Sequence, residues 1–164
     1  MIQIFVTGGT FDKSYNHIQG ALYFEKTHLP EMLERSRCQL DIQIDTLMMI
    51  DSLDMNTKHT EAIVAACMTS TSEKIVITHG TDRMVETAQI LAQEKGLQNK
   101  TIILTGAMIP YAFGSSSDGF FNLGCALAWV QMLEPQIYIG MQGKCFDWEK
   151  VYKDQEKGIF KSIV

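Results

Sequence analysis

The stretch that decides the fold is Ile2–Thr10, IQIFVTGGT, in which an apolar run stops at two glycines and a threonine. Its β-branched and aromatic residues predict a strand over residues 2–7. A glycine turn directly after a strand suits two kinds of loop. One kind cradles a phosphate, and the other lifts a single hydroxyl into a site. Other parts of the sequence are needed to choose between these two interpretations.

Further stretches of the chain alternate between strand-like and helix-like patterns. The strands are expected at residues 41–47, 74–78, 101–105 and 136–141. The helices are expected at residues 30–37, 57–70, 83–95 and 118–133. Short, nearly continuous apolar strands are typical of a parallel sheet covered on both faces. We therefore predict an α/β fold: a Rossmann-like or flavodoxin-like layered domain with a mainly parallel sheet and helices on both faces.

Local signals add detail to this outline. Gly96 is expected to cap the helix that precedes it, and Asp118 to cap the start of the helix that follows it. The polar segment 11–20 has a turn-like composition and is expected to form a mobile loop over a site.

Composition limits the possible classes of function. The chain has 164 residues, and we expect a single domain over residues 1–164. A net charge of −5 argues against nucleic acid as a partner. The apolar runs are too short to cross a membrane, and Met1 leads into Ile2 without a signal-peptide pattern, so we expect a cytoplasmic protein with no membrane partner. The spacing of the four cysteines and four histidines predicts no metal site, and we expect no cofactor.

Reactive side chains follow the predicted strands, at the edge of the sheet where α/β proteins bind ligands. They include Thr10, Thr81, Asp82 and, further along, Lys153. A hydroxyl becomes a nucleophile when a neighbouring base takes its proton, and an unprotonated lysine can be that base. Backbone N–H groups of glycine turns can hold an oxyanion. The phosphate-binding patterns GxGxxG and GxxxxGK[ST] are absent, so the sequence favours an enzyme with a hydroxyl nucleophile over a nucleotide binder.

Five motifs occur in one order along the chain: TGGTF (7–11), SLDMN (52–56), ITHGTDRMVETA (77–88), LTGAMIP (104–110) and SSSDGFFNLGCAL (115–127). With these motifs the sequence resembles the bacterial-type L-asparaginase family. The likeness runs from Ile2 to about Phe160 and covers the N-terminal domain of the usual two-domain enzymes. The chain therefore looks like a short, single-domain asparaginase.

The resemblance implies hydrolysis of the side-chain amide of L-asparagine to L-aspartate and ammonia through a threonine acyl-enzyme. Thr10 matches the threonine that attacks the amide carbon. Thr81 matches a threonine that works with a lysine, and Lys153 matches that lysine. Asp82 matches an aspartate that also contacts the ammonium group of the substrate.

The remaining expected site residues also come from the resemblance. Ser52 matches the serine that binds the substrate carboxylate, and Gly80 and Ala107 are expected to bind substrate as well. A loop tyrosine assists catalysis in the family. Tyr23 matches it when the alignment has no gap, and Tyr15 is the alternative.

The sequence also departs from the family pattern. Leu53 stands where the family often has a glutamine that contacts the substrate amino group. The second domain, from which a neighbouring subunit supplies a carboxylate, has no counterpart in these residues. We therefore expect a homodimer or homotetramer, formed through an open sheet edge and the apolar helix at residues 120–133.

Several alternatives stay open at this point. The chain could be a non-catalytic asparaginase-like domain that binds an amino acid or a partner protein. Asp82 could cap the helix at Arg83, and Lys153 could be a solvated lysine in the charged run 149–157. Asp118 and Asn122 are interpreted as cap and packing residues.

Overall fold

A central sheet with the strand order β4-β1-β5-β6-β7-β8 organises the protein. The computed structural model describes residues 1–163. The strands of the sheet are β1 (Ile2–Gly8), β4 (Ile42–Ile50), β5 (Lys74–Thr78), β6 (Thr101–Thr105), β7 (Ile137–Met141) and β8 (Lys144–Asp147). The first five strands in this order pair in parallel, and β8 pairs with β7 in the antiparallel direction. Without β8, the order is that of flavodoxin-like folds, which confirms the predicted class.

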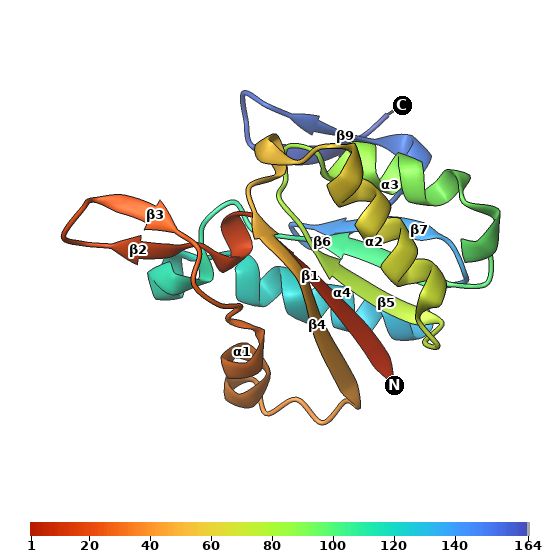
Figure 1. Ribbon diagram of the computed structural model, residues 1–164, viewed down its shortest axis with the longest axis horizontal. Helices are drawn as coiled ribbons and strands as arrows, with labels where there is room; N and C mark the ends of the chain where they lie inside the picture. Colours follow the sequence, from red (N-terminus) through yellow and green to blue (C-terminus); the bar gives the residue numbers. More distant parts are fainter. Residues whose placement is uncertain (164) are drawn as a thin grey trace.

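Helices cover both faces of this sheet (Figure 1). One face carries α2 (Thr57–Thr69) and α3 (Met84–Gln93), and the other carries α1 (Leu29–Arg35) and α4 (Gly119–Met132). Strand β5 shows why both faces need cover, because its successive side chains point to opposite sides. Ile75 and Ile77 pack in the core under α2 and α3, whereas Val76 packs in the core with α1 and α4.

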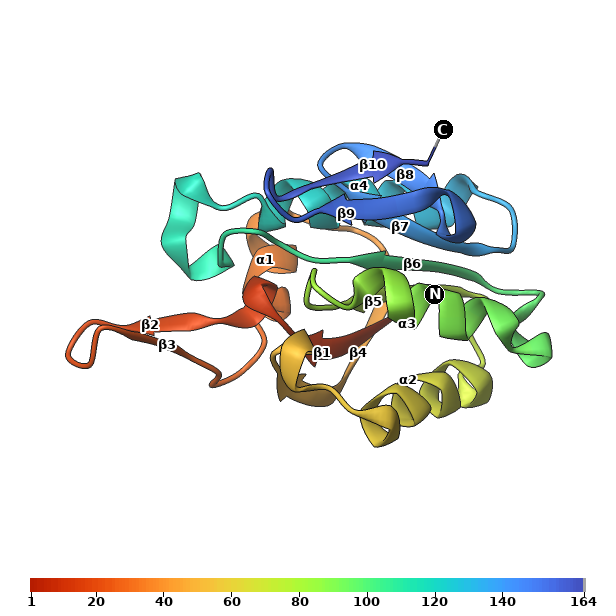
Figure 2. The ribbon, with the colours of Figure 1, turned by 90° about the horizontal axis from the view of Figure 1, so that it is seen from above.

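Two small hairpins stand outside the main sheet. The first consists of β2 (Ser14–Asn16) and β3 (Ala21–Tyr23), and the second of β9 (Val151–Asp154) and β10 (Ile159–Ser162). Figures 1 and 2 both show the β2–β3 hairpin extending away from the sheet. The short 3-10 turns are η1 (Thr10–Asp12), η2 (Ser52–Asp54), η3 (Lys95–Leu97), η4 (Tyr111–Ser116) and η5 (Trp148–Lys150).

The structure corrects the prediction of a loop over residues 11–20. This segment forms the end of η1 and then the β2–β3 hairpin. Its polar composition belongs to the hairpin turn, where Asn16 Oδ1 accepts hydrogen bonds from the N–H groups of Ile18 and Gln19, each at 3.0 Å. Gly20 completes the turn with a φ of 63°, a conformation that side chains disfavour.

Of two predicted helix caps, the one at Gly96 is wrong, and the one at Asp118 holds in position only. Helix α3 ends at Gln93, and Gly96 lies in η3, where the missing Cβ leaves room for the Met68 side chain. Asp118 stands at the N-cap position of α4, but its carboxylate makes no capping hydrogen bond. It accepts instead from the N–H groups of Met108 and Ile109, at 2.9–3.0 Å. The other predicted helices and strands agree with the structure to within a few residues at their ends.

No helix among residues 1–163 combines the length and the apolar character that a membrane crossing requires.

Candidate active site

The site lies where the direction of the strand order reverses. From β1 the chain continues to β4 on one side, and β5 follows on the other side of β1. The loops after β1 and β5 therefore emerge next to each other at the carboxyl ends of the strands, the place where open α/β sheets bind ligands. Thr10 follows β1, and Thr81 and Asp82 follow β5.

Glycines let three loops come into direct backbone contact at this edge. Gly9 has a φ of 72°, and a Cβ at this position would overlap the backbone of Gly80. A Cβ on Gly80 would in turn overlap the Ser52 side chain. The N–H of Gly9 donates a 2.8 Å hydrogen bond to the Ile50 carbonyl, which fixes the first loop to the end of β4. The structure thus places the loops of Thr10, Gly80 and Ser52 against one another.

Lys153 joins this group from a distant part of the chain. Its Nζ lies 2.9 Å from Thr81 Oγ1 and 2.6 Å from Asp82 Oδ1. The Lys153 side chain is only 8% exposed, so it is not the solvated lysine that its charged neighbours in the sequence allowed. Asp82 is occupied by this ion pair, and the N-cap position of α3 belongs to Arg83. Thr81, Asp82 and Lys153 therefore form one hydrogen-bonded group.

The β9–β10 hairpin brings Lys153 to the site, and Gln142 holds the hairpin there. Gln142 lies in the tight turn between β7 and β8, and its φ is 56°. Its Nε2 donates to the Gly158 carbonyl at 2.9 Å, and its Oε1 accepts from the Phe160 N–H at 3.0 Å. Val151 and Phe160 are buried in the core under α2 and α3. This hairpin is anchored on both sides of Lys153.

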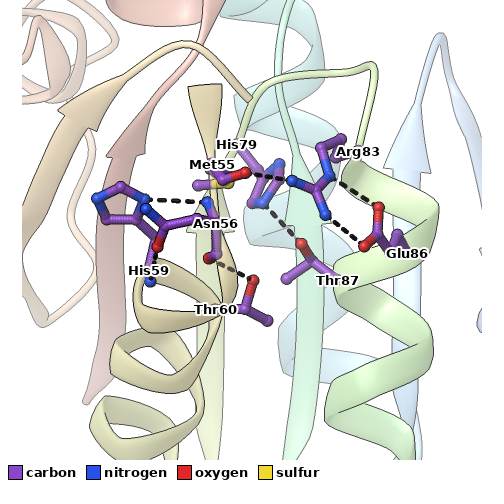
Figure 3. Close-up of polar contacts among 8 residues, drawn as sticks. All are labelled: Met55, Asn56, His59, Thr60, His79, Arg83, Glu86 and Thr87. Carbon is purple, nitrogen blue, oxygen red and sulfur yellow. Dashed lines mark hydrogen bonds and ion pairs between the residues drawn. The ribbon is translucent and has the colours of Figure 1, made fainter. Parts of the chain in front are cut away.

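Polar contacts hold the residues on either side of the Thr81–Asp82 loop, and Figure 3 shows those among His79, Thr87, Arg83 and Glu86. His79 is fully buried, with Nδ1 at 2.7 Å from the Gly80 carbonyl and Nε2 at 3.0 Å from Thr87 Oγ1. Burial lowers the pKa of His79 to about 4, so the ring is neutral at neutral pH. Arg83 donates to the Met55 carbonyl and pairs with Glu86. His79 and Arg83, which flank the Thr81–Asp82 loop, are thus each held by a neighbouring element.

Ser52 presents a buried hydroxyl that lacks a partner within the described chain. Ser52 is 1% exposed, and its Oγ makes no hydrogen bond among residues 1–163. Buried polar atoms are nearly always hydrogen-bonded, so an unpaired hydroxyl against Gly80 fits a position that a ligand completes.

The Ala107 loop is shaped by two residues of α4. Asp118 accepts the N–H groups that follow Ala107, as described above. Asn122 is fully buried, and its Nδ2 donates to the Gly106 carbonyl at 2.9 Å, while its Oδ1 accepts from the Gln142 N–H at 2.9 Å. Asn122 therefore ties the ends of β6 and β7 together. Both residues do more than the capping and packing expected of them, since they fix two loops of the site.

The two candidate tyrosines lie on the β2–β3 hairpin, and neither hydrogen-bonds to the Lys153 group. Tyr23 is 42% exposed, with its hydroxyl 3.5 Å from Glu25 Oε2. Tyr15 is 52% exposed and packs edge-on against Phe113. Leu53, at the position of the family's glutamine, is 69% exposed. Among residues 1–163, no group of three or more His, Cys, Asp or Glu side chains is placed to hold a metal ion.

Sequence reasoning missed Gln142 as a site residue and gave Asn122 a lesser role. Gln142 carried a partial signal, because it directly follows a predicted strand and the next residue, Gly143, favours a turn. Nothing in the sequence indicated the hydrogen bonds of the Gln142 side chain.

Comparison with known proteins shows the family to which the chain belongs. The family model described as "Asparaginase, N-terminal" matches residues 1–161. Two solved structures are similar to the chain over 98% of its length: the thermostable L-asparaginase from Thermococcus kodakarensis (TM-score 0.82, 25% identity, 50% of that chain) and a probable cytoplasmic L-asparaginase from Campylobacter jejuni (TM-score 0.81, 27% identity, 52% of that chain).

Curated relatives fall into two groups. A probable periplasmic L-asparaginase of Haemophilus influenzae is 35% identical over 130 residues, which cover 74% of this chain and 36% of the relative. A subunit of the glutamyl-tRNA(Gln) amidotransferase of Pyrococcus furiosus is 32% identical over 155 residues, which cover 89% of this chain and 34% of the relative. The chain thus spans about a third of these relatives' length. On the match over residues 1–161, the chain belongs to the asparaginase family and corresponds to its N-terminal domain.

Proposed function

We propose that the protein is an amidohydrolase that converts L-asparagine to L-aspartate and ammonia through a threonine acyl-enzyme. The observation that carries the proposal is the contact of Lys153 with both Thr81 and Asp82 at the switch point of the sheet. A shielded lysine in contact with a hydroxyl and a carboxylate is placed to transfer a proton, and the similarity to L-asparaginases supports the choice of reaction.

In this proposal Thr10 Oγ1 attacks the side-chain amide carbon of the substrate. The oxyanion that forms is stabilised by backbone N–H groups of the loops that contain Gly80 and Ala107. The Thr10 proton passes to the amide nitrogen with the help of Thr81 and Lys153, and the C–N bond breaks to release ammonia. Water then hydrolyses the acyl-enzyme, which returns the proton to Thr10 and releases aspartate.

Substrate binding is assigned to Ser52 and Asp82. The unpaired Ser52 hydroxyl donates to the substrate α-carboxylate, and Asp82 Oδ atoms accept from the substrate ammonium. Tyr23 is retained as the assisting tyrosine, which would have to approach from the exposed hairpin. Leu53 supplies no polar contact, so the ammonium is held by fewer groups than in family members with glutamine there.

Two other functions have specific support. The similarity to the glutamyl-tRNA(Gln) amidotransferase component favours an amide hydrolysis whose ammonia is used by a partner protein. A non-catalytic amino-acid-binding or interaction domain is the further alternative, in which the unpaired Ser52 hydroxyl binds an amino acid without turnover.

We also propose a cytoplasmic location, supported by the four free cysteines and by the Campylobacter relative, which is described as probably cytoplasmic, although the Haemophilus relative is described as periplasmic.

Ammonia release from asparagine and from glutamine tests the proposal. The purified chain is expected to form ammonia and aspartate in equal amounts. Thr10→Ala should lower kcat at least ~10³-fold, because only positioning and electrostatics remain without the nucleophile. Thr71→Ala, the same change at an exposed position before β5, should leave kcat unchanged. Aspartate binding without turnover would instead favour the non-catalytic domain.

A further inference from the structure

An ion pair joins the turn that carries Thr10 to the turn that carries Ser52. Lys13 Nζ contacts Asp51 Oδ2. The two side chains are 18% and 27% exposed, compared with 63% and 39% for the surface pair of Lys150 and Asp147. Exposed ion pairs contribute little to a structure, whereas a partly buried pair is screened less by water and salt. The Lys13–Asp51 pair is therefore suited to hold two segments together.

Each partner is also bound to the turn beside it. Lys13 closes η1, with its N–H donating to the Thr10 carbonyl at 3.3 Å. Asp51 precedes η2 as its N-cap, and its Oδ1 accepts from the Leu53 N–H at 3.0 Å. The ion pair therefore connects two turns that each carry a proposed substrate-contacting hydroxyl, Thr10 in η1 and Ser52 in η2.

The charges around Asp51 keep this connection intact at neutral pH. Burial raises the pKa of the Asp51 carboxyl, but the hydrogen bonds from Lys13 and the Leu53 N–H, with the positive charges of Lys13 and Lys153, outweigh it. The net pKa lies below the ordinary value of 3.8. The influence of Lys153 also means that Asp51 lies within electrostatic reach of the Thr81–Asp82–Lys153 group. On its other side, the Lys13 ammonium lies 5.8 Å from the ring centroid of Phe24, just after β3.

We propose that Lys13 and Asp51 are positioning residues, whose ion pair fixes the turn of Thr10 relative to the turn of Ser52. The inference rests on the proposed function, in which Thr10 attacks the amide carbon while Ser52 holds the carboxylate of the same small molecule. The separation of the two hydroxyls then decides whether the substrate is bound in a reactive geometry. A misplacement of about 1 Å can cost on the order of 10²-fold in rate.

Kinetics of single and double variants test the positioning role. Lys13→Met and Asp51→Asn are each expected to lower kcat/KM by about 10- to 100-fold, mostly through kcat, because the reacting atoms are misaligned. The double variant should be no worse than the more impaired single variant, since both changes break the same link. Lys13→Arg keeps the charge and should stay within about threefold of the wild type. Lys150→Met, which breaks the exposed pair with Asp147, should leave kcat and KM unchanged.

Three kinetic results would overturn the inference. If Lys13→Met has the wild-type kcat and KM but a lower melting temperature, the ion pair is only a stabilising contact. Effects that multiply in the double variant would mean that the two residues act independently. A higher KM in Lys13→Met that Asp51→Asn does not reproduce would mean that Lys13 contacts the substrate directly.

Hydrogen exchange provides a readout that needs no turnover. The Leu53 amide, which bonds Asp51, is expected to exchange at least about tenfold faster in Lys13→Met than in the wild type and at the wild-type rate in Lys150→Met. If the wild type fails to release ammonia while this difference is present, the proposed function fails and the link between the turns stands. If the wild type is active but exchange and kinetics of Lys13→Met match it, the inference fails alone.

Discussion

At residue scale, the proposed site depends on Lys153, whose side chain is largely shielded from water. Lys153 is 8% exposed and Asp82 is 34% exposed, so the lysine is shielded while its carboxylate partner still reaches solvent. In the proposed reaction Asp82 also accepts from the substrate ammonium, so one carboxylate contacts both the substrate and Lys153.

The first prediction concerns Lys153. Lys153→Met is expected to lower kcat by more than it raises KM, because the lysine acts on the proton and not on substrate binding. Asp82→Ala should change both kcat and KM, because in the proposed reaction Asp82 contacts the substrate as well as Lys153. Initial rates of ammonia release over a series of asparagine concentrations measure kcat and KM for both variants.

Lys157→Met serves as the matched control, because this lysine is exposed and lies in the turn between β9 and β10. It should keep the wild-type kcat and KM. If Lys153→Met keeps them as well, the base is a group other than Lys153.

The second prediction concerns His79 and stability at acid pH. Its pKa is about 4 in the fold, against 6.5 for an ordinary histidine. Between these values the unfolded chain binds a proton that the folded chain does not, so stability must fall as the pH drops from 6.5 to 4. At about 1.4 kcal/mol per unit, the loss is on the order of 3 kcal/mol. Urea unfolding at a series of pH values in this range measures it.

His79→Gln is expected to be less stable at neutral pH, because the hydrogen bonds to Gly80 and Thr87 are altered, but its stability should depend less on pH. His17→Gln removes an exposed histidine and should keep the wild-type slope. Equal slopes in all three proteins would show that His79 titrates normally in the fold.

At the scale of elements, the β9–β10 hairpin decides whether Lys153 reaches the site. Gln142→Met keeps the length of the side chain but removes the bonds to Gly158 and Phe160. Each neutral hydrogen bond contributes about 1 kcal/mol, so the hairpin should open more often. We expect kcat to fall and the β9–β10 amides to exchange faster, as measured by hydrogen exchange.

The control for this third prediction is Gln136→Met. Gln136 precedes β7, and its Nε2 bonds Asp147 Oδ1 at 3.1 Å, at the opposite end of the β7–β8 pair. This variant should lose some stability and keep kcat. A reduced kcat in Gln136→Met, with a normal one in Gln142→Met, would contradict the assigned role of the hairpin.

The central strands could be predicted from the sequence because each is a short apolar run bounded by polar or glycine residues. Strand β5 shows this best, with the same bounds in prediction and structure. Strands β8, β9 and β10 were missed because they are short, partly exposed and rich in charged residues. The pairing of β2 with β3 was missed for the same reason, since a three-residue strand carries almost no periodic signal.

Residues of the candidate site could be proposed from the sequence, but the residues that hold its loops in place could not. Thr10, Thr81 and Asp82 follow apolar strands, and the rule for ligand sites in α/β sheets brings their loops together. Lys153 lies further along from a predicted strand, but its assignment to Thr81 came from the family resemblance, because nothing in a charged run indicates that one lysine is buried. Gln142, Lys13 and Asp51 act through long-range hydrogen bonds and ion pairs, which leave no pattern in the local sequence.

At the scale of the whole molecule, apolar side chains are exposed on α4, on η4 and on the β2–β3 hairpin. Helix α4 buries Leu123, Leu127 and Val130 against the sheet, so this side of the stretch 120–133 needs no further cover. Several large apolar side chains remain exposed. On α4 and η4 they are Phe113 (44%), Phe120 (38%) and Phe121 (59%), and on the hairpin Tyr15 (52%), Ile18 (85%) and Leu22 (44%). An isolated two-stranded hairpin is barely stable in water, and exposed apolar patches mark interaction surfaces.

The last prediction is that copies of this chain cover that surface as a homodimer or homotetramer. Light scattering of the wild type is then expected to give a multiple of 18.5 kDa, and ammonia release per chain should fall on dilution below the dissociation constant. Phe121→Glu places a charge in the patch and should shift the protein toward the monomer. Met132→Glu, at the other end of α4 and 81% exposed, should leave the mass unchanged. A wild-type monomer of 18.5 kDa with full activity at every dilution would instead mean that the pocket is complete within one chain.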